Sequence, residues 1–306
     1  MSVTIREKLE EHLINKGGFR TALAIQGGGM RGVYSGGAVA HLEKSGLRTA
    51  FDVVVGSSAG AINGLFLLSG QSPIAVRLYI DHLNNSKFIN PLRLTRIVDV
   101  DFMVDTALKT ICPIDVEALR ESPCLLQVVM TDSKTGEARV VTNRDEHVDI
   151  YEAVRATAAL PALYNKKILV DGHRCIDGGI IEPIPVFRAL ESKPDLTIAI
   201  ASHPRGFRHP PMSRAFKAVQ RMALRGQTDT IKEMVETIAI RYSLANELLE
   251  SESSNSRGIY GLWPSDISKL ASRTTKSREL LESCREMGER DMQSLLDSPY
   301  INPNDD

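Results

Sequence analysis

The chain has 306 residues, of which 42% are hydrophobic and 25% are charged. A chain of this length and composition can bury a full globular core, either as one large domain or as a domain with an appendage. With a formal net charge of −1, the chain lacks the excess of positive charge that is typical of nucleic-acid-binding proteins, so we expect no nucleic-acid partner.

The N-terminal residues 1–11 are charged and amphipathic, and they lack the apolar run that a secretory signal requires. The four cysteines show neither C-x-x-C nor Cys/His spacing, which favours buried thiols in a reducing compartment over disulfides or a zinc site. The most apolar stretch, residues 59–68, is too short to cross a bilayer. We therefore expect a cytoplasmic protein, and we expect any contact with a membrane to be peripheral.

Strand-like and helix-like segments alternate in the first two thirds of the chain. Residues 21–25 and 51–55 are short apolar runs typical of buried strands, and helices are predicted after them at residues 33–44 and 59–68. Further strands are predicted at residues 125–130, 139–142 and 196–201, and a hairpin turn at Asp171-Gly172. This order is typical of an α/β protein with a parallel sheet.

From about His203 the strand-like runs end and apolar residues recur every three or four positions, first over residues 231–249 and then over residues 280–296. This spacing predicts amphipathic helices. We therefore expect an α/β body at residues 19–202 and a helical C-terminal region at residues 203–306.

A G-x-S-x-G motif lies between the second predicted strand and its helix, as Gly56-Ser57-Ser58-Ala59-Gly60. A nucleophile elbow needs a strand that runs into it and a helix that runs out, and its tight turn leaves no room for side chains two positions before and after the serine. Gly56 and Gly60 meet that need, so Ser58 is the candidate nucleophile. A small-residue turn without chemistry is the alternative, and the flanking strand and helix favour the elbow.

A glycine-rich loop follows the first predicted strand, as Gly27-Gly28-Gly29-Met30-Arg31-Gly32. With Asp52 20 residues beyond Gly32, it also fits a dinucleotide-binding fingerprint. However, Asp52 lies at the beginning of its strand, whereas a ribose-binding acid lies at the end. In a right-handed β-α-β unit the loop would face Ser58, and its N–H groups would form an oxyanion hole. We favour the oxyanion hole over a non-catalytic nucleotide- or phosphate-binding loop.

Asp177-Gly178-Gly179 follows the predicted hairpin, where an Asp-Gly pair is by itself an ordinary turn. Asp177 becomes a candidate base because none of the seven histidines lies in a recognisable motif. His203 and His209 follow Asp177 in the Ser–Asp–His chain order of α/β-hydrolases, so a Ser-His-Asp carboxylesterase of small esters stays open. Their neighbouring prolines are more typical of exposed loop histidines.

Together and in this order, the three motifs resemble those of the patatin-like phospholipase family. The resemblance covers about residues 19–201 and includes residues 156–161, a small-residue segment that ends in a proline. It implies a three-layer sandwich with a mostly parallel central sheet flanked by helices, and it makes residues 19–202 the catalytic domain. Gln26 and residues 162–164 depart from the family pattern without removing a proposed catalytic atom.

The resemblance also implies a lipid acyl hydrolase of phospholipase A or lysophospholipase type with a Ser58–Asp177 dyad. Asp177 would accept the Ser58 proton, and Ser58 would attack the ester to form an acyl-enzyme. The N–H groups of Gly28 and Gly29, with Met30 as a third candidate, would hold the oxyanion. No metal or other cofactor is expected.

Two basic features have a functional and a structural interpretation. Arg31 would add positive charge to the oxyanion loop or touch a lipid phosphate, or it would brace the loop through a salt bridge. Residues 205–225 hold six Lys or Arg residues, no Asp or Glu, and interleaved apolar residues. Such a segment can lie on an anionic membrane surface, and a solvated helix face packed on the body is the more ordinary alternative. The sequence does not predict the oligomeric state.

Overall fold

One central sheet runs through the computed structural model, which describes residues 3–93, 96–161, 163–208, 224–251 and 253–302. Within these residues the sheet has eight strands in the order β5-β6-β3-β2-β1-β7-β8, and β4 pairs with β3. The strands are β1 (Thr21–Ile25), β2 (Val53–Ser57), β3 (Leu125–Asp132), β4 (Ala138–Thr142), β5 (Ile168–Val170), β6 (His173–Asp177), β7 (Leu196–Ile200) and β8 (Ile259–Leu262). Strands β8, β7, β1, β2 and β3 are parallel, whereas β4, β5 and β6 join through antiparallel pairs. The sheet is therefore mixed, with a parallel centre.

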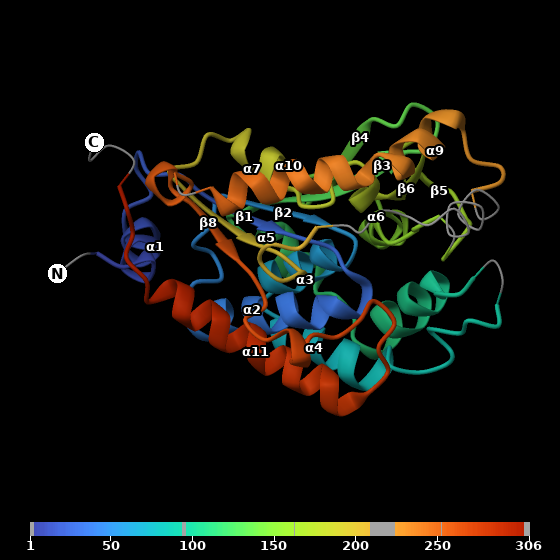
Figure 1. Cartoon of the computed structure of the whole chain (residues 1–306), viewed down its shortest axis with the longest axis horizontal. Coiled ribbons are helices and arrows are strands. Elements are labelled where there is room, and N and C mark those ends of the chain that lie inside the picture. The colour runs from blue at the N-terminus through green and yellow to red at the C-terminus, as the bar shows by residue number, and fades with distance from the viewer. Residues whose placement is uncertain (1–2, 94–95, 162, 209–223, 252, 303–306) are drawn as a thin grey trace.

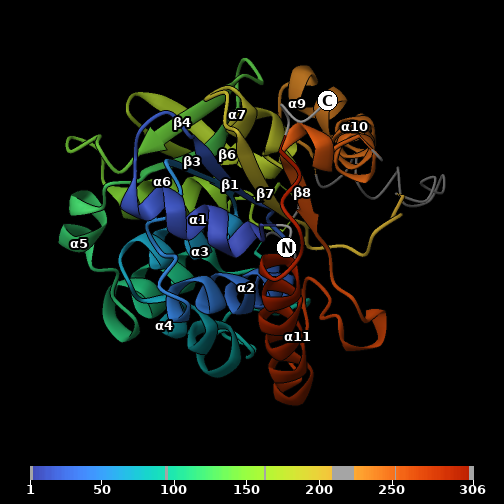
Figure 2. The same cartoon turned by 90° about the vertical axis from the view of Figure 1, so that its left-hand side faces the viewer.

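Helices cover both faces of the sheet (Figures 1 and 2). Leu23 and Ile25 of β1 belong to a buried hydrophobic cluster that they share with residues of α2 (Gly32–Lys44), α3 (Ala59–Leu68) and α11 (Arg278–Leu296). Ala22 and Ala24 of the same strand face α7 (Val186–Leu190) and α10 (Ile238–Glu250). The other helical segments are α1 (Ile5–Ile14), η1 (Gly29–Arg31), α4 (Ser72–Arg77), η2 (Leu78–His82), η3 (Phe102–Ile111), α5 (Val116–Glu121), α6 (Ile150–Thr157), η4 (Gly178–Ile180), α9 (Asp229–Glu236), η5 (Asn255–Arg257) and η6 (Ile267–Lys269). The predicted three-layer α/β architecture is confirmed.

The strands and helices around the G-x-S-x-G motif lie close to their predicted positions. The second strand begins at Val53 rather than at residue 51, and it continues to Ser57. The predicted hairpin turn is present, with positive φ angles of 45° at Asp171 and 76° at Gly172, as the tightest hairpin turns require. None of the described helices is both long and apolar enough to span a bilayer, and α3, the most apolar stretch, is buried along its whole length.

We expected a helical C-terminal region. The region contains helices, and it also adds β8 to the edge of the sheet in parallel with β7. Its long helix α11 packs directly on α2 (Figure 2). Glycines allow this close contact: a Cβ atom on Gly37 would lie 2.2 Å from the carbonyl oxygen of Arg285, and one on Gly288 would lie 2.0 Å from that of Tyr34. The described part of residues 203–306 therefore completes the sheet and one helical layer.

Candidate active site

Ser58 lies at the sharp turn between β2 and α3, with φ 53° and ψ −128°. A positive φ is strained for a residue that carries a side chain. The neighbouring glycines leave room for the turn: a Cβ atom on Gly56 would lie 2.5 Å from the nitrogen of Ala61, and one on Gly60 would lie 2.1 Å from the carbonyl oxygen of Ile25. This geometry is that of a nucleophile elbow.

The backbone of Ser58 is held by Thr157, at the end of α6. The Ser58 N–H donates to the Thr157 hydroxyl at 2.8 Å, and that hydroxyl donates to the carbonyl oxygen of Val129 at 2.5 Å. Thr157 is fully buried. Sequence reasoning did not single it out, although it lies in the 156–161 segment that resembles the family.

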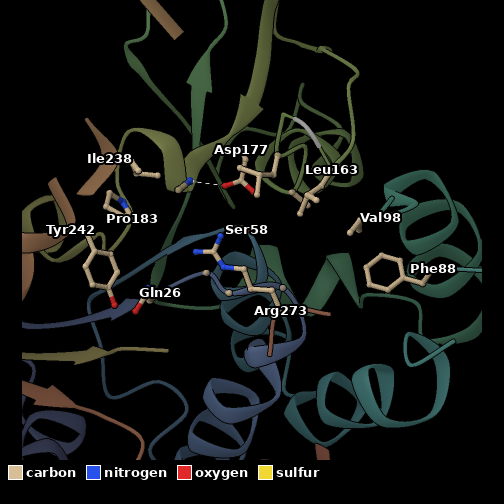
Figure 3. Close-up of a pocket in the computed structure, with 16 residues that line it drawn as sticks. Gln26, Ser58, Phe88, Val98, Leu163, Asp177, Pro183, Ile238, Tyr242 and Arg273 are labelled. Atoms are coloured by element: carbon tan, nitrogen blue, oxygen red, sulfur yellow. Dashed lines mark hydrogen bonds between the residues drawn. The ribbon is translucent and has the colours of Figure 1, made fainter. Parts of the chain in front are cut away.

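Asp177 ends β6, and antiparallel pairing places it opposite Met130 of β3, the strand that lies between β6 and the elbow strand β2. Its side chain accepts the Gly179 N–H at 2.7 Å, and its own N–H donates to the carbonyl oxygen of Ala159 at 3.1 Å. Gly178 permits close packing here, because a Cβ atom on it would lie 2.0 Å from the carbonyl oxygen of Val129. Asp177 and Ser58 line the same pocket (Figure 3).

Asp177 is only 5% exposed. Burial raises its pKa to about 6, while the Gly179 N–H, the nearby Ser58 hydroxyl and the positive charge of Arg273 lower it by smaller amounts. A carboxylate with this pKa is still mostly ionised at neutral pH, and it is a stronger base than an ordinary aspartate. The site can therefore take up a proton at Asp177.

The glycine-rich loop lies against the elbow, as the β-α-β argument predicted. A Cβ atom on Gly27 would lie 2.8 Å from the Cβ of Ser58, so a larger residue would collide with the serine. Gly29 has a φ of 58°, a conformation that glycine adopts readily. Gly32, which begins α2, would carry its Cβ 2.6 Å from the Tyr79 hydroxyl.

The loop has fewer available donors than the sequence suggested. Within the described part of the chain, the N–H groups of Gly28 and Gly29 donate no hydrogen bond. The Met30 N–H, in contrast, donates to the carbonyl oxygen of Arg273 at 3.1 Å, and the Met30 side chain is buried in the core. Only the two glycines of the three candidates can therefore present a donor to an oxyanion.

Arg31 braces the loop from outside the pocket, and among the described residues it forms no salt bridge of the kind considered above. Its Nε donates to the carbonyl oxygen of Ala271 at 3.2 Å, and a terminal nitrogen contacts the ring of His203. Gln26 also contacts this ring, at 3.2 Å from its Nδ1. His203 is thus buried rather than an exposed loop histidine.

The geometry bears on the two alternatives for the site, a Ser-His-Asp carboxylesterase and a nucleotide- or phosphate-binding loop. No histidine is among the described residues that line the pocket with Ser58 and Asp177, and His209 lies outside the described residues. Asp52 accepts the Thr21 N–H at 2.8 Å, at the opposite end of the parallel strands from the glycine-rich loop, so it cannot reach a ribose bound there. The described residues contain no cluster of three or more His, Cys, Asp or Glu placed to hold a metal ion.

The pocket has an apolar and a more polar side (Figure 3). Phe88, Val98 and Leu163 line one side, and Gln26 and Tyr242 line the other together with Pro183 and Ile238. A hydrogen bond of 3.1 Å from the Val98 N–H to the Leu163 carbonyl oxygen joins two of the apolar wall segments. An apolar chain fits the first side.

The fold and the Ser58 turn together define an α/β protein of the nucleophile-elbow type. The chain belongs to the patatin-like phospholipase family, whose family model matches residues 23–190. Membership of this family supports acyl hydrolase activity on lipids at the family level.

Two relatives and one solved structure show how far the similarity extends. The uncharacterized protein YjjU of Escherichia coli strain K12 is 23% identical over 257 residues, which cover 80% of this chain and 68% of YjjU. The uncharacterized NTE family protein Mb1092c of Mycobacterium bovis is 28% identical over 195 residues, which cover 60% of this chain and only 49% of that protein. The crystal structure of VipD from Legionella pneumophila superposes with a TM-score of 0.56 at 16% identity, over 93% of this chain and 70% of VipD. The likeness to VipD supports the fold alone.

Proposed function

We propose that this protein is a lipid acyl hydrolase of phospholipase A or lysophospholipase type, with Ser58 as nucleophile and Asp177 as general base. One observation carries the proposal: a strained serine and a buried aspartate of raised pKa line one pocket beside two N–H groups that have no partner among the described residues. These are the parts that acyl transfer through a covalent intermediate needs.

In the acylation step, Asp177 accepts the proton of the Ser58 hydroxyl while the Ser58 oxygen attacks the ester carbonyl. Burial supports this role because it raises the pKa of Asp177 to about 6, which brings the carboxylate closer to neutral pH. The alcohol of the ester leaves with a proton from Asp177, and the acyl group stays on Ser58.

The N–H groups of Gly28 and Gly29 stabilise the negative charge that develops on the carbonyl oxygen. Loss of one such donor typically lowers the rate by roughly 10²–10³-fold. Asp177 then takes a proton from water as the water oxygen attacks the acyl-enzyme, and it returns that proton to the Ser58 oxygen as the fatty acid leaves. Phe88, Val98 and Leu163 form the apolar wall against which the acyl chain lies.

Hydrolysis of matched esters tests the proposal. Phospholipids, lysophospholipids, acylglycerols and short p-nitrophenyl esters are given to the wild type and to Ser58→Ala, Asp177→Asn and Ser57→Ala. Ser57 is the matched control because it is buried next to the nucleophile, with its hydroxyl 3.3 Å from the carbonyl oxygen of Glu182. We expect Ser58→Ala and Asp177→Asn to lose turnover and Ser57→Ala to keep it. Turnover that survives Ser58→Ala contradicts the proposal.

Cytoplasmic location and peripheral contact with an anionic membrane through residues 205–225 belong to the same proposal. The four cysteines are free and buried, in keeping with a reducing compartment. Residues 209–223 lie outside the described part. Of the flanking arginines, Arg205 lies 5.2 Å over the Trp263 ring and Arg208 pairs with Glu250 at 2.8 Å. Co-sedimentation with neutral and anionic vesicles tests the membrane contact. Equal binding to both would contradict the proposed contact with an anionic membrane.

A further inference from the structure

Arg273 is the one cationic side chain among the described residues that line the pocket. It lies in the segment between η6 and α11, outside the region that matches the family model. Figure 3 shows its guanidinium in the middle of the pocket, with Phe88 and Val98 on one side and Tyr242 and Gln26 on the other. The C-terminal region, whose Ile238 and Tyr242 also line the pocket, thus supplies a charge to the site.

The backbone of Arg273 is fixed to the glycine-rich loop. Its carbonyl oxygen accepts the Met30 N–H at 3.1 Å, and it would lie 2.8 Å from a Cβ atom on Gly29. The side chain therefore begins beside the two candidate oxyanion donors, and this position depends on main-chain contacts that a substitution at 273 leaves in place.

Within the described residues the Arg273 guanidinium has no ion pair and no hydrogen bond. Its charge nevertheless reaches the site, because it lowers the pKa of Asp177 after the larger effects of burial and hydrogen bonding. It also lowers the pKa of Arg31, for which burial is the larger cause. Two guanidinium groups near one glycine-rich loop repel each other, and an anion bound at Arg273 would relieve that repulsion.

We propose that Arg273 is a specificity-determining residue that binds the phosphate of the substrate, so that the enzyme prefers acyl esters with a phosphate near the scissile bond. The inference rests on the proposed function. With the acyl chain against Phe88, Val98 and Leu163 and the ester at Ser58, the rest of the substrate extends toward the guanidinium. Arginine binds phosphate oxygens through two parallel N–H donors. A neutral acylglycerol has no group that uses this charge.

The test compares three monomeric substrates with the same short acyl chain: a 1-monoacylglycerol, its 3-phosphate and its 3-phosphocholine. The measured quantity is the ratio of kcat/KM for each phosphate-bearing ester to kcat/KM for the neutral ester. In Arg273→Gln we expect this ratio to fall about tenfold, as for loss of a charge-assisted hydrogen bond. A fall for the 3-phosphate alone assigns the site to phosphomonoesters, and a fall for both assigns it to lipid phosphates in general.

Two variants separate recognition from a structural role. Lys276→Gln removes an equal charge from the same segment, where both residues are exposed but Lys276 does not line the pocket, and it should leave the ratio unchanged. Arg273→Lys keeps the charge and should restore part of the ratio. Arg273→Gln should also move the acid limb of the pH profile for the neutral ester to higher pH, because a positive charge that lowers the pKa of Asp177 is lost.

Failure of this inference differs from failure of the proposed function. If Arg273→Gln lowers all three rates in the same proportion, or changes none of them, Arg273 does not recognise phosphate, and the hydrolase proposal stands. If the wild type shows no Ser58-dependent hydrolysis of any of the three esters, the hydrolase proposal itself is wrong.

Discussion

The Thr157 hydroxyl accepts the Ser58 N–H at 2.8 Å while it donates to the carbonyl oxygen of Val129 at 2.5 Å. One buried hydroxyl thus joins the strained elbow residue to the neighbouring strand β3. Because Ser58 has a positive φ, a conformation that persists only where the surroundings enforce it, we regard Thr157 as the residue that holds the elbow in place.

Thr157→Val should lower kcat by about tenfold or more, with a smaller change in KM. The substitution keeps the side-chain volume but removes the hydroxyl that the Ser58 N–H and the Val129 carbonyl oxygen both contact. An unsatisfied buried polar group typically costs about 1–3 kcal/mol. Steady-state kinetics on a p-nitrophenyl ester measure the effect. Thr157→Ser keeps the hydroxyl and should retain most of the activity, and full activity in Thr157→Val would show that the elbow needs no such support.

The acid limb of the kcat/KM profile should have its midpoint at pH about 6, because Asp177 with a raised pKa of about 6 accepts a proton only when it is ionised. An unperturbed aspartate would place the limb near pH 4, at about its ordinary value. A catalytic histidine would also titrate near pH 6.5, so the profile is repeated with His203→Gln. Persistence of the limb in that variant favours the dyad, and its loss together with turnover favours a Ser-His-Asp site.

Asp177→Asn should abolish turnover and yet stabilise the fold at neutral pH. The pKa of Asp177 rises from 3.8 to about 6 on folding, so this group favours the folded state below pH 3.8 and loses that contribution as pH rises through about 6. In the wild type the free energy of unfolding falls by at most about 3 kcal/mol over this range. A neutral asparagine at position 177 does not ionise, so the variant keeps that stability. The difference in Tm between variant and wild type should therefore grow from about pH 4 to about pH 8. A difference that is flat or shrinks over this range would mean that the carboxylate is not buried at such a cost.

Gly288→Ala should lower the free energy of unfolding by about 1–3 kcal/mol, as overpacking typically does. A Cβ atom at this position would lie 2.0 Å from the carbonyl oxygen of Tyr34, so α11 must move away from α2. In an exposed helix interior the same change would instead stabilise by about 1 kcal/mol. Ser294→Ala, at an exposed position of the same helix, is the control for urea denaturation, and equal midpoints for both variants would contradict the close contact.

The layered fold, the strands around the site and the elbow could be predicted from sequence because their signals are local. Ser58 stands between a strand-like and a helix-like run, and the glycines at positions 56 and 60 mark the tight turn. Asp177 was harder to predict, since an Asp-Gly pair also marks an ordinary turn. Its burial and its position on the strand next to β3 are properties of the folded chain.

The features that sequence reasoning missed depend on contacts between distant segments. Strand β8 has four residues and contains a glycine, so it shows no alternation that would indicate a strand. Met30 is unavailable as an oxyanion donor because the Arg273 carbonyl oxygen accepts its N–H. Neither residue carries a local signal of this contact. His203 likewise looked exposed beside proline, although Arg31 and Gln26 enclose it.

The central claim is that Ser58 is the nucleophile, and covalent labelling tests it most directly. The wild type, Ser58→Ala and Ser57→Ala are treated with a fluorophosphonate probe, and the modified residue is located by peptide mass spectrometry. We predict a single adduct on Ser58 in the wild type and in Ser57→Ala, and no adduct in Ser58→Ala. Labelling of Ser58→Ala to the same extent, or an adduct on another residue of the wild type, would contradict the account.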